Sequence, residues 1–326
     1  MRAVSVADVY GARQRLAGVV ARTPLVSSPT LSARVGTAVY LKLESRQLTG
    51  SFKLRGAANA IAHLDAAALR RGVVTASTGN HGRALAHAAF TVGARAVICL
   101  SALVPHNKVE AIRALGAELR IVGRSQDDAL REAERLAVEE GMTLVPPFDD
   151  PRVIAGQGTI GLEILEDLPD VGGVLVPLSG GGLLAGVALV LETARPSVAV
   201  LGVSMEAGCA MHASLRAGKP VEVEEVPTLA DSLGGGIGVA NRHTFAMVQQ
   251  LADASVLVGE ASIARAVRHA YREEREVVEG AAAVGIAALL DDKIDLALVP
   301  GPIVVVLSGR NVDMDLHARL ITGAAA

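Results

Sequence analysis

Short apolar runs alternate with helical segments along almost the whole chain, and this alternation most constrains the fold. The runs that read as strands are residues 39–44, 73–76, 96–100, 119–122, 143–145, 174–177, 198–203, 255–258 and 303–307. Helical patterns separate them, for example at residues 54–63, 126–140 and 183–193. Strands and helices that alternate at such short spacing are typical of a parallel sheet with helices on its faces. The sequence therefore predicts an α/β protein.

The length and composition of the chain favour two domains. A chain of 326 residues, of which 51% are hydrophobic, can bury a large core. After Pro146 and Pro147, the patch from Phe148 to Pro151 interrupts the strand–helix alternation. We therefore expect residues 51–149 to form a small domain, and residues 1–50 and 150–326 to form a large one.

Charge and sequence pattern exclude several classes of protein. The net charge of −3 gives no basic surface for nucleic acid. The N-terminus has no apolar stretch of signal-peptide length, and Cys99 and Cys209 show no metal-ligand spacing, so we expect a cytoplasmic protein. The uncharged run from Val171 to Leu191 is long enough to span a membrane. Pro177 and three consecutive glycines interrupt it, which favours a buried strand, a loop and a buried helix instead.

Lys53 is the first candidate for chemistry. It lies between a small polar turn, Thr49-Gly50-Ser51, and the first residues of a predicted helix. A desolvated lysine has a lowered pKa, and its neutral amine can form a Schiff base with an aldehyde cofactor. Taken alone, the position favours a surface lysine at a helix start, and only the rest of the chain changes that balance.

Three loops that follow predicted strands could bind ligands, because sites in parallel α/β sheets lie beyond the carboxyl ends of the strands. The loop from Ser77 to His81 offers hydroxyl, amide and backbone donors for a carboxylate, although Ser77 or Thr78 could simply cap the following helix. The loop Ser179-Gly180-Gly181-Gly182-Leu183 favours a phosphate, because consecutive glycines let backbone amides approach it closely. The loop from Ser308 to Asn311 offers a hydroxyl to a heterocyclic nitrogen, or forms an ordinary turn.

The glycine loop also supports a rival hypothesis. It fits a loose dinucleotide pattern, Gly180-x-Gly182-x-x-Ala185, with Glu206 near the end of the next strand. A nicotinamide-dependent oxidoreductase is therefore an alternative. This fingerprint lies late in the chain, and it leaves Lys53 unexplained.

Taken together, these stretches resemble the pyridoxal-phosphate enzymes of the serine/threonine dehydratase family, which have fold type II. The matching segments occur in the family's order and cover nearly the whole chain: residues 43–44, 49–57, 77–82, 108–117, 156–160, 179–183 and 308–313. The resemblance implies a tryptophan synthase β-like fold, with two doubly wound parallel-sheet domains. It also implies that the cofactor, pyridoxal 5'-phosphate, lies in the cleft between them.

The resemblance further implies roles for individual residues. Lys53 would form the internal aldimine and later remove the α-proton of the substrate. The other residues implied to contact the cofactor are Phe52 beside it, Asn80 at the ring hydroxyl, Ser179, Gly180, Gly181, Gly182 and Leu183 at the phosphate, Glu279 near the ring and Ser308 at the pyridine nitrogen. The substrate carboxylate would lie on Ser77, Thr78, Asn80 and His81. A neutral partner at the pyridine nitrogen suits elimination of a β-hydroxyl group better than transamination.

Three departures from the family pattern bear on the activity. Thr78 stands where dehydratases often have alanine and serine racemases have a catalytic serine, so it is a second candidate catalytic residue and a racemase side activity is conceivable. Ser204 and Ala210 stand where some relatives have cation-binding carboxylates, so we predict no metal site. Arg310 replaces a usual glycine and places a possible anion-binding side chain at the rim of the pocket.

Residues 202–206 and 230–238 look most like the hydroxyectoine-utilization dehydratase branch of this family. We therefore predict a lyase that dehydrates and deaminates a β-hydroxy amino acid derived from hydroxyectoine. A general L-threonine or L-serine dehydratase and a serine racemase are the alternatives within the cofactor class. The resemblance implies a homodimer, and a small amino acid is the only partner that we expect.

Overall fold

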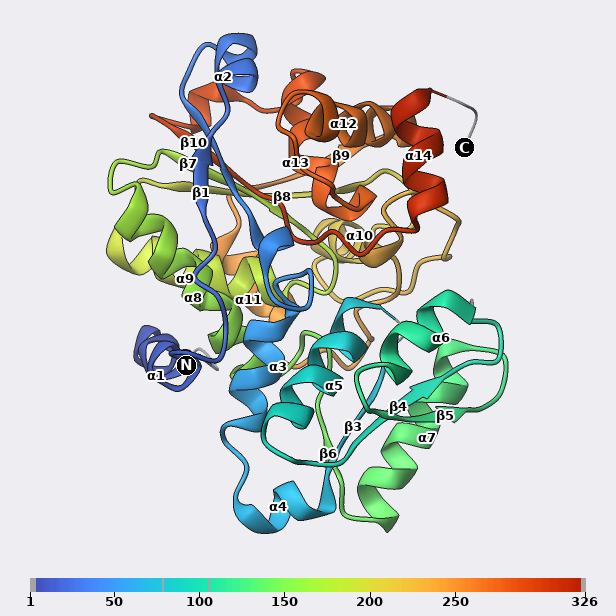
Figure 1. Ribbon diagram of the computed structural model, residues 1–326. Coiled ribbons are helices and arrows are strands. Elements are labelled where there is room, and N and C mark those ends of the chain that lie inside the picture. The colour runs from blue at the N-terminus through green and yellow to red at the C-terminus, as the bar shows by residue number, and fades with distance from the viewer. Residues whose placement is uncertain (1–3, 78, 105, 324–326) are drawn as a thin grey trace.

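Two sheets organise the computed structural model, which describes residues 4–77, 79–104 and 106–323 (Figure 1). The larger sheet has the strand order β1-β2-β10-β7-β8-β9, and the smaller sheet has the order β5-β4-β3-β6. This arrangement of two sheets with helices on their faces is the predicted α/β fold. The division of the chain into domains at residues 50/51 and 149/150 stays a prediction.

The strands of the larger sheet come from both ends of the chain, and those of the smaller sheet come from one continuous stretch. The larger sheet contains β1 (Leu25–Ser27), β2 (Val39–Lys42), β7 (Gly173–Pro177), β8 (Ala199–Met205), β9 (Ala254–Val258) and β10 (Ile303–Val306). The smaller sheet contains β3 (Val73–Ala76), β4 (Ala96–Leu100), β5 (Glu118–Ile121) and β6 (Thr143–Leu144). Neighbouring strands are parallel, except that the edge strand β1 pairs antiparallel with β2. That antiparallel edge departs from the purely parallel sheets predicted, and such mixed edges are common in α/β folds.

The helices follow the predicted order, with two that the apolar pattern did not indicate, α2 and α14. Their bounds are α1 (Val6–Leu16), α2 (Pro29–Val35), α3 (Lys53–Ile61), α4 (Ala66–Arg71), α5 (Asn80–Thr91), α6 (His106–Arg113), α7 (Gln126–Glu139), α8 (Pro151–Asp167), α9 (Gly182–Ala194), α10 (Ala210–Ala217), α11 (Thr244–Leu251), α12 (Glu260–Arg272), α13 (Gly280–Leu290) and α14 (Met314–Thr322). Short 3-10 helices are η1 (Glu44–Arg46), η2 (Asp231–Leu233) and η3 (Leu296–Leu298).

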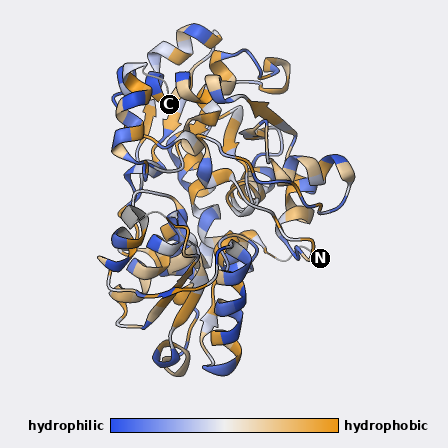
Figure 2. Ribbon diagram, turned by 90° about the vertical axis from the view of Figure 1, so that its right-hand side faces the viewer, coloured by the Kyte–Doolittle hydropathy of each residue, from blue (hydrophilic) through white to orange (hydrophobic). Residues whose placement is uncertain are grey.

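Both faces of the larger sheet are covered, so its central strands are apolar on both sides. Val174 and Val176 of β7 pack into a cluster with α1, α8, α9 and α11, whereas Leu175 packs with α2, α12, α13 and α14 on the other face. Strands buried on both faces read as continuous apolar runs rather than as alternating ones. Figure 2 shows this pattern, with apolar colour concentrated in the strands and hydrophilic colour on the outer helix surfaces.

The run from Val171 to Leu191 forms β7, the glycine loop and most of α9, which confirms the predicted strand, loop and helix. None of the helices in the described part of the chain combines the length and the apolar character that crossing a lipid bilayer requires.

Helices α8 and α9 approach so closely that a side chain at Gly186 has no room. A Cβ atom on Gly186 would lie 2.4 Å from the carbonyl oxygen of Ile154 and 2.6 Å from the backbone nitrogen of Gly158. We therefore expect Gly186→Ala to force the two helices apart. It should lower the free energy of unfolding by about 1–3 kcal/mol, measured by urea denaturation.

The matched control is Gly11→Ala in the solvent-facing part of α1. A Cβ atom there meets only the flexible end of the Arg15 side chain, at 3.3 Å. Alanine is a better helix former than glycine, so this variant should be neutral or more stable by about 0.5–1 kcal/mol. Equal effects of the two substitutions would contradict the packing argument.

Candidate active site

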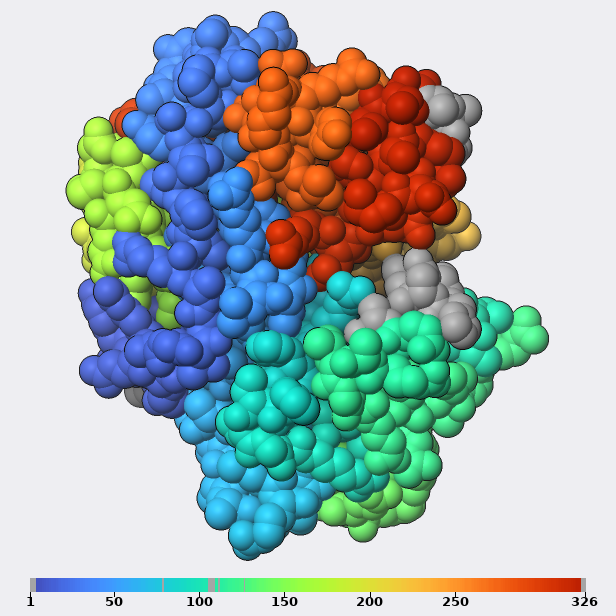
Figure 3. Space-filling view, in the orientation of Figure 1, coloured from blue at the N-terminus to red at the C-terminus, as the bar shows by residue number. Residues whose placement is uncertain are grey.

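The lysine segment is held against the end of the last strand. Because β2 and β10 are parallel neighbours, the residues that follow both strands leave the sheet side by side. Ser51 and Gly309 form an antiparallel bridge. Backbone nitrogens then donate hydrogen bonds in both directions, from Phe52 to the carbonyl of Ser308 at 3.0 Å and from Arg310 to the carbonyl of Gly50 at 2.8 Å. In the space-filling view (Figure 3), the blue segment that leads to the lysine borders the red segment that follows β10.

Lys53 is the first residue of α3, and its amine is largely removed from water. Its Nζ donates a hydrogen bond to the backbone carbonyl of Pro147 at 2.7 Å and lies 5.1 Å from the centre of the Phe52 ring. Burial lowers the pKa of Lys53 to about 8, and the nearby Glu279 carboxylate opposes part of this shift. The result is an amine that loses its proton far more easily than a surface lysine does.

Asn80 and Glu279, two predicted site residues separated by 199 positions in the sequence, contact one another. Asn80 donates from Nδ2 to Oε1 of Glu279 at 2.7 Å, and the backbone nitrogen of Asn311 donates to Oε2 at 3.1 Å. Burial raises the pKa of Glu279 to about 7, and the neighbouring Asp231 adds to the shift. This carboxyl group therefore changes its charge near neutral pH.

Two residues of this cluster were not predicted from the sequence. They are Arg83 and, as a partner of Asn80, Asn311. Asn311 donates from Nδ2 to Oδ1 of Asn80 at 2.6 Å, and Arg83 donates to Oδ1 of Asn311 at 2.7 Å. Arg83 lies one turn after Asn80 on α5, and its helical spacing is the only sequence signal that could have placed it here.

His81 is a buried, neutral imidazole. Its Nε2 lies 2.9 Å from the carbonyl oxygen of Val145, so Nε2 carries the proton and Nδ1 presents a lone pair. Burial lowers the pKa of His81 to about 3, and the positive charge of Lys53 adds to the effect. Nδ1 is buried and has no hydrogen-bond partner among the described residues. His81 can therefore accept a hydrogen bond at this site but cannot act as an acid there.

The helices that begin at the site leave their first backbone N–H groups uncapped. Among the described residues, no side chain caps α3, α5, α9 or α13. The prediction that Ser77 could cap the helix after it is therefore wrong, and Thr78 lies outside the described residues. Other helices are capped by the side chains of Ser5, Ser28, Asp65, Ser125, Asp150 and Asp313, whereas in the described part of the chain α10, α11 and α12 also have no hydrogen bond to an N-cap side chain. Uncapped helix N-termini bind anions through free N–H groups and the helix dipole.

The glycine loop has the geometry of a backbone anion site. Gly181 adopts a left-handed conformation with φ of +87°, and Gly182 begins α9. A Cβ atom on Gly180 would lie 2.2 Å from the ring of Phe148, so only glycine fits there. Phe148 follows Pro147, whose carbonyl binds Lys53, and this places the loop next to the lysine. Leu183 is buried and Ser179 is partly exposed at the start of the loop.

The remaining predicted site residues lie at the ends of strands. Ser308 is buried directly after β10, and Ser77 is half-buried after β3. Ser77, Asn80 and His81 come from the smaller sheet and its helix, whereas Ser308, Glu279 and the glycine loop come from the larger sheet. The candidate site is therefore built by both sheets.

Glu206 does not have the environment of a ribose ligand. It is exposed, and Nζ of Lys293 donates a hydrogen bond to its Oε1 at 3.1 Å. Within residues 4–77, 79–104 and 106–323, no group of three or more His, Cys, Asp or Glu side chains could hold a metal ion.

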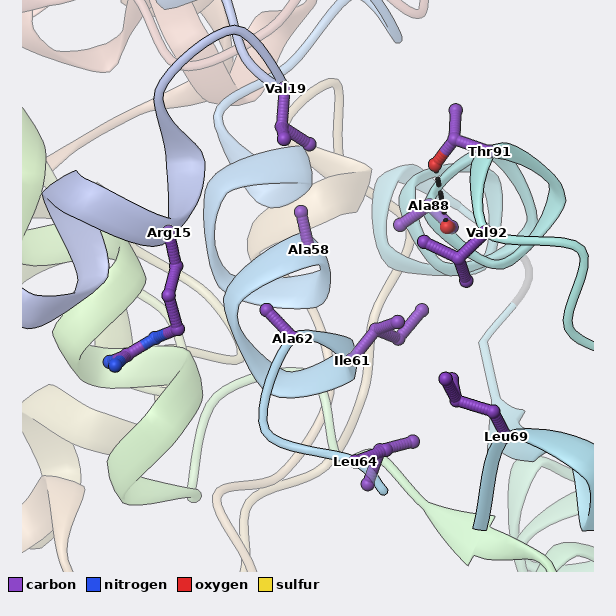
Figure 4. Close-up of a pocket in the computed structure, with 10 residues that line it drawn as sticks. All are labelled: Arg15, Val19, Ala58, Ile61, Ala62, Leu64, Leu69, Ala88, Thr91 and Val92. Carbon is purple, nitrogen blue, oxygen red and sulfur yellow. Dashed lines mark hydrogen bonds between the residues drawn. The ribbon is translucent and has the colours of Figure 1, made fainter. Parts of the chain in front are cut away.

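A separate cavity of about 200 Å³ lies between α1, α3, α4 and α5 (Figure 4). Its lining is mainly apolar, with Ile61, Leu64, Leu69 and Val92 among the residues that face it. Its polar lining residues are engaged elsewhere, since Arg15 donates to Asn59 at 2.9 Å and Thr91 donates to the carbonyl of Ala88 at 2.8 Å. This cavity therefore lacks the groups that the chemistry at Lys53 requires.

Comparison with known proteins defines the class. The model of the family "Pyridoxal-phosphate dependent enzyme" matches residues 16–309. A "Putative threonine dehydratase" of Sinorhizobium fredii is 57% identical over 98% of this chain and 96% of its own length. An "L-threonine ammonia-lyase" of Thermotoga maritima is 44% identical over 98% of this chain and 78% of its own. The structure of maize serine racemase superposes with a TM-score of 0.92 at 33% identity and covers 98% of both chains.

The chain belongs to the family of pyridoxal-phosphate dependent enzymes, and within it to the threonine dehydratase type of lyase. Its fold is fold type II, as predicted, and its cofactor is pyridoxal 5'-phosphate. The nicotinamide hypothesis is therefore wrong. The glycine pattern misled because backbone amides at a helix start suit any phosphate, whether it belongs to a dinucleotide or to another cofactor.

The residues present fit this cofactor. The uncapped start of α9 and its glycines offer backbone donors for a phosphate, and the desolvated amine of Lys53 is suited to an aldehyde. The orphaned Nδ1 of His81 is a buried acceptor at the same place. We propose that Gly180, Gly181, Gly182 and Leu183 hold the phosphate, and that Phe52, Asn80, Glu279 and Ser308 surround the ring.

The pKa of Lys53 predicts how cofactor attachment depends on pH. Only the neutral amine attacks an aldehyde, so the attachment rate to the apoprotein should rise about tenfold per pH unit and level off above pH 8. Glu279→Gln removes the charge that raises this pKa and should move the midpoint to lower pH. Visible absorbance after rapid mixing measures the rate. A rate that still rises steeply at pH 10 would contradict the desolvated lysine.

Proposed function

We propose that this protein dehydrates and deaminates a β-hydroxy amino acid, with Lys53 as the base that removes the α-proton. The observation that carries this proposal is the buried Lys53 amine with its lowered pKa, fixed in a chain whose relatives are named threonine dehydratases and ammonia-lyases. When bound, pyridoxal phosphate supplies the aldehyde that captures an amine and the conjugated ring that accepts electrons from the α-carbon.

The residues of the chain would divide the remaining work among them. We propose that Ser77, Thr78, Asn80 and His81 bind the substrate carboxylate, and the uncapped first turn of α5 supports this role. The Lys53 amine takes up the α-proton, and the carbonyl of Pro147 accepts a hydrogen bond from the ammonium that results. His81 stays neutral, so it accepts a hydrogen bond without competing for that proton.

The overall reaction balances as loss of water followed by hydrolysis. The α-proton and the β-hydroxyl group leave as water, and the released enamine tautomerises and takes up water without further catalysis. The products are one oxo acid and one ammonia molecule per substrate. No redox partner is needed for this sequence.

For the substrate itself, we propose an amino acid derived from hydroxyectoine. Support comes from residues 202–206 and 230–238, which resemble the hydroxyectoine-utilization branch. The second of these segments contains η2, whose first residue, Asp231, lies close enough to Glu279 to raise the pKa of that carboxyl group. Arg310 is exposed just after the end of β10. Arg310 and the loop from Asp231 to Gly238 are the proposed specificity elements.

A serine racemase activity is the second candidate. The observation that favours it is the similarity to maize serine racemase over nearly the full chain. Thr78 retains a hydroxyl group at the position where racemases have their catalytic serine. We also propose that the protein works in the cytoplasm as a homodimer, with residues 51–149 as the small domain.

A substrate panel tests the proposal most directly. Purified holoenzyme is incubated with L-threonine, L-serine, threo-3-hydroxyaspartate and the ring-opened hydroxyectoine amino acid, and ammonia and oxo acid are measured. We expect turnover of the hydroxyectoine derivative to exceed that of threonine and serine. Fast turnover of threonine or serine instead would identify a general dehydratase. Formation of D-serine from L-serine, without oxo acid, would favour the racemase.

A further inference from the structure

Four ionisable side chains form a buried ion network next to the lysine segment. They are Lys42 on β2, Glu44 in η1, Arg55 on α3 and Glu163 on α8. The side chains of Lys42 and Glu44 are fully buried, that of Arg55 is 1% exposed and that of Glu163 is 12% exposed. Nothing in the proposed chemistry uses these groups directly, so their burial needs a separate explanation.

Arg55 joins the network through two bidentate ion pairs. Its Nε and Nη2 donate to the two carboxylate oxygens of Glu44 at 2.9 and 2.8 Å. Its Nη1 and Nη2 donate to the two oxygens of Glu163 at 2.7 and 2.9 Å. Nη1 also donates to Oγ1 of Thr159 at 3.1 Å. The planar guanidinium thus fixes η1 and α8 in both distance and angle relative to α3.

Lys42 completes the charge balance of the network. Its Nζ donates to Glu163 at 2.6 Å and to the carbonyl of Thr23 at 2.7 Å. Two cations therefore face two carboxylates. Burial alone would lower the pKa of Arg55, but the carboxylates of Glu44 and Glu163 outweigh it and raise that pKa. Burial alone would raise the pKa of Glu163. Its contacts with Arg55, and to a smaller extent with Lys42, outweigh burial and hold that pKa below its usual value.

Stability by itself is a weak reason for such a network. Charges taken out of water lose most of their hydration, and well-packed apolar residues often give equal or greater stability. An ion pair of this kind adds geometric specificity, because it stabilises one arrangement of its partners and destabilises others. The relevant question is which arrangement the network fixes.

The network holds both ends of the lysine segment, residues 45–54. Glu44 and Arg55 bracket residues 45–54, and Lys53 lies two positions before Arg55. Between these ends, the segment is hydrogen-bonded to residues 308–311, for example from Nδ2 of Asn311 to the carbonyl of Thr49 at 3.0 Å. The backbone around Lys53 is thus held at three places: by Glu44 before it, by Arg55 after it and by residues 308–311 beside it.

Through α8, the network also connects the helix that carries Lys53 to the helix that begins at the glycine loop. At Arg55, α3 and α8 are in direct backbone contact, since a Cβ atom on Gly156 would lie 2.5 Å from the carbonyl oxygen of Arg55. The other face of α8 packs against α9, which begins at the glycine loop. Helix α8 is therefore the common support of the amine and of the anion site, and Glu163 ties Arg55 to it.

We propose that Arg55, held by Glu44 and Glu163, is a positioning residue that sets the placement of the Lys53 amine relative to the glycine loop. The proposal rests on the proposed role of Lys53 as the residue that carries the cofactor. Errors of about 1 Å in such placements can cost about a hundredfold in rate. The network would then act on the rate of reaction at Lys53 more than on substrate affinity.

The test compares Arg55→Lys with Arg22→Lys. Both replace a guanidinium by an ammonium next to α8, but Arg22 is 48% exposed and pairs with Glu166 and Asp167 on the outer side of that helix. Lysine at position 55 keeps the charge but cannot form two bidentate pairs. Readouts are the rate of cofactor attachment to the apoprotein, kcat and KM for the amino acid, and urea unfolding of the apoprotein.

We expect Arg55→Lys to fold and to attach the cofactor about tenfold more slowly than the unaltered protein. Its kcat should fall by about tenfold or more, while KM changes by less than about threefold. Arg22→Lys should stay within about twofold in every readout. Should Arg55→Lys not fold, Glu163→Gln, which keeps the shape and one acceptor, takes its place with the same expected pattern.

Two results would overturn the proposal. One is a variant at position 55 or 163 that loses stability but keeps its attachment rate and kcat within about twofold, because the network would then serve stability alone. The other is an equal loss in Arg22→Lys. Attachment of the cofactor to another lysine in the unaltered protein would instead refute the proposed role of Lys53, and that outcome is visible before any variant is made.

Discussion

The parallel pairing of β2 with β10 is the constraint on which the candidate site depends. It joins the first part of the chain to its last strand, with Val39 opposite Ile303 and Lys42 opposite Val306. Parallel strands carry the chain out of a sheet at the same edge, so the lysine segment and the loop after β10 must emerge together. The bridge between Ser51 and Gly309 then continues this pairing beyond the sheet. Without it, the backbones of Phe52 and Ser308 would not be brought into hydrogen-bond contact.

Desolvation and helix orientation together give the site its charge preference. Helices α3, α5, α9 and α13 present uncapped N-termini, which favour the negative charges of a phosphate and a carboxylate. Burial shifts the pKa values of Lys53, His81 and Glu279 toward the neutral forms of all three side chains. A neutral amine can act as nucleophile and base, and a neutral imidazole can accept a hydrogen bond. The surroundings thus prepare these side chains for chemistry before any ligand enters.

Much of the fold and part of the site could be predicted from the sequence, because the signals were local. Apolar runs located every strand of the two sheets except the short edge strand β1. Glycines and hydroxyl residues indicated the two loops that we propose to bind anions. Helices α2 and α14 were missed although each has both end signals, Ser28 with Gly36 and Asp313 with Gly323, because neither has a long apolar stripe.

What could not be predicted depends on contacts between distant residues. Lys42 is 121 positions from Glu163, and Arg55 is 108 positions from it, so spacing gives no hint of the ion network. The same holds for Asn311, which binds Asn80 over 231 positions, and for the carbonyl of Pro147, which accepts a hydrogen bond from Nζ of Lys53. Backbone acceptors such as Pro147 leave no trace in residue identity at all.

We propose that Lys53, and no other lysine, carries the cofactor. The most direct measurement is reduction of the holoenzyme with borohydride, followed by proteolysis and mass spectrometry of the labelled peptide. Lys42 is the useful internal comparison, since its side chain is fully buried and its Nζ donates hydrogen bonds to Glu163 and to the carbonyl of Thr23. We expect the reduced cofactor on Lys53 alone. A label on Lys42, Lys108, Lys219 or Lys293 would contradict it.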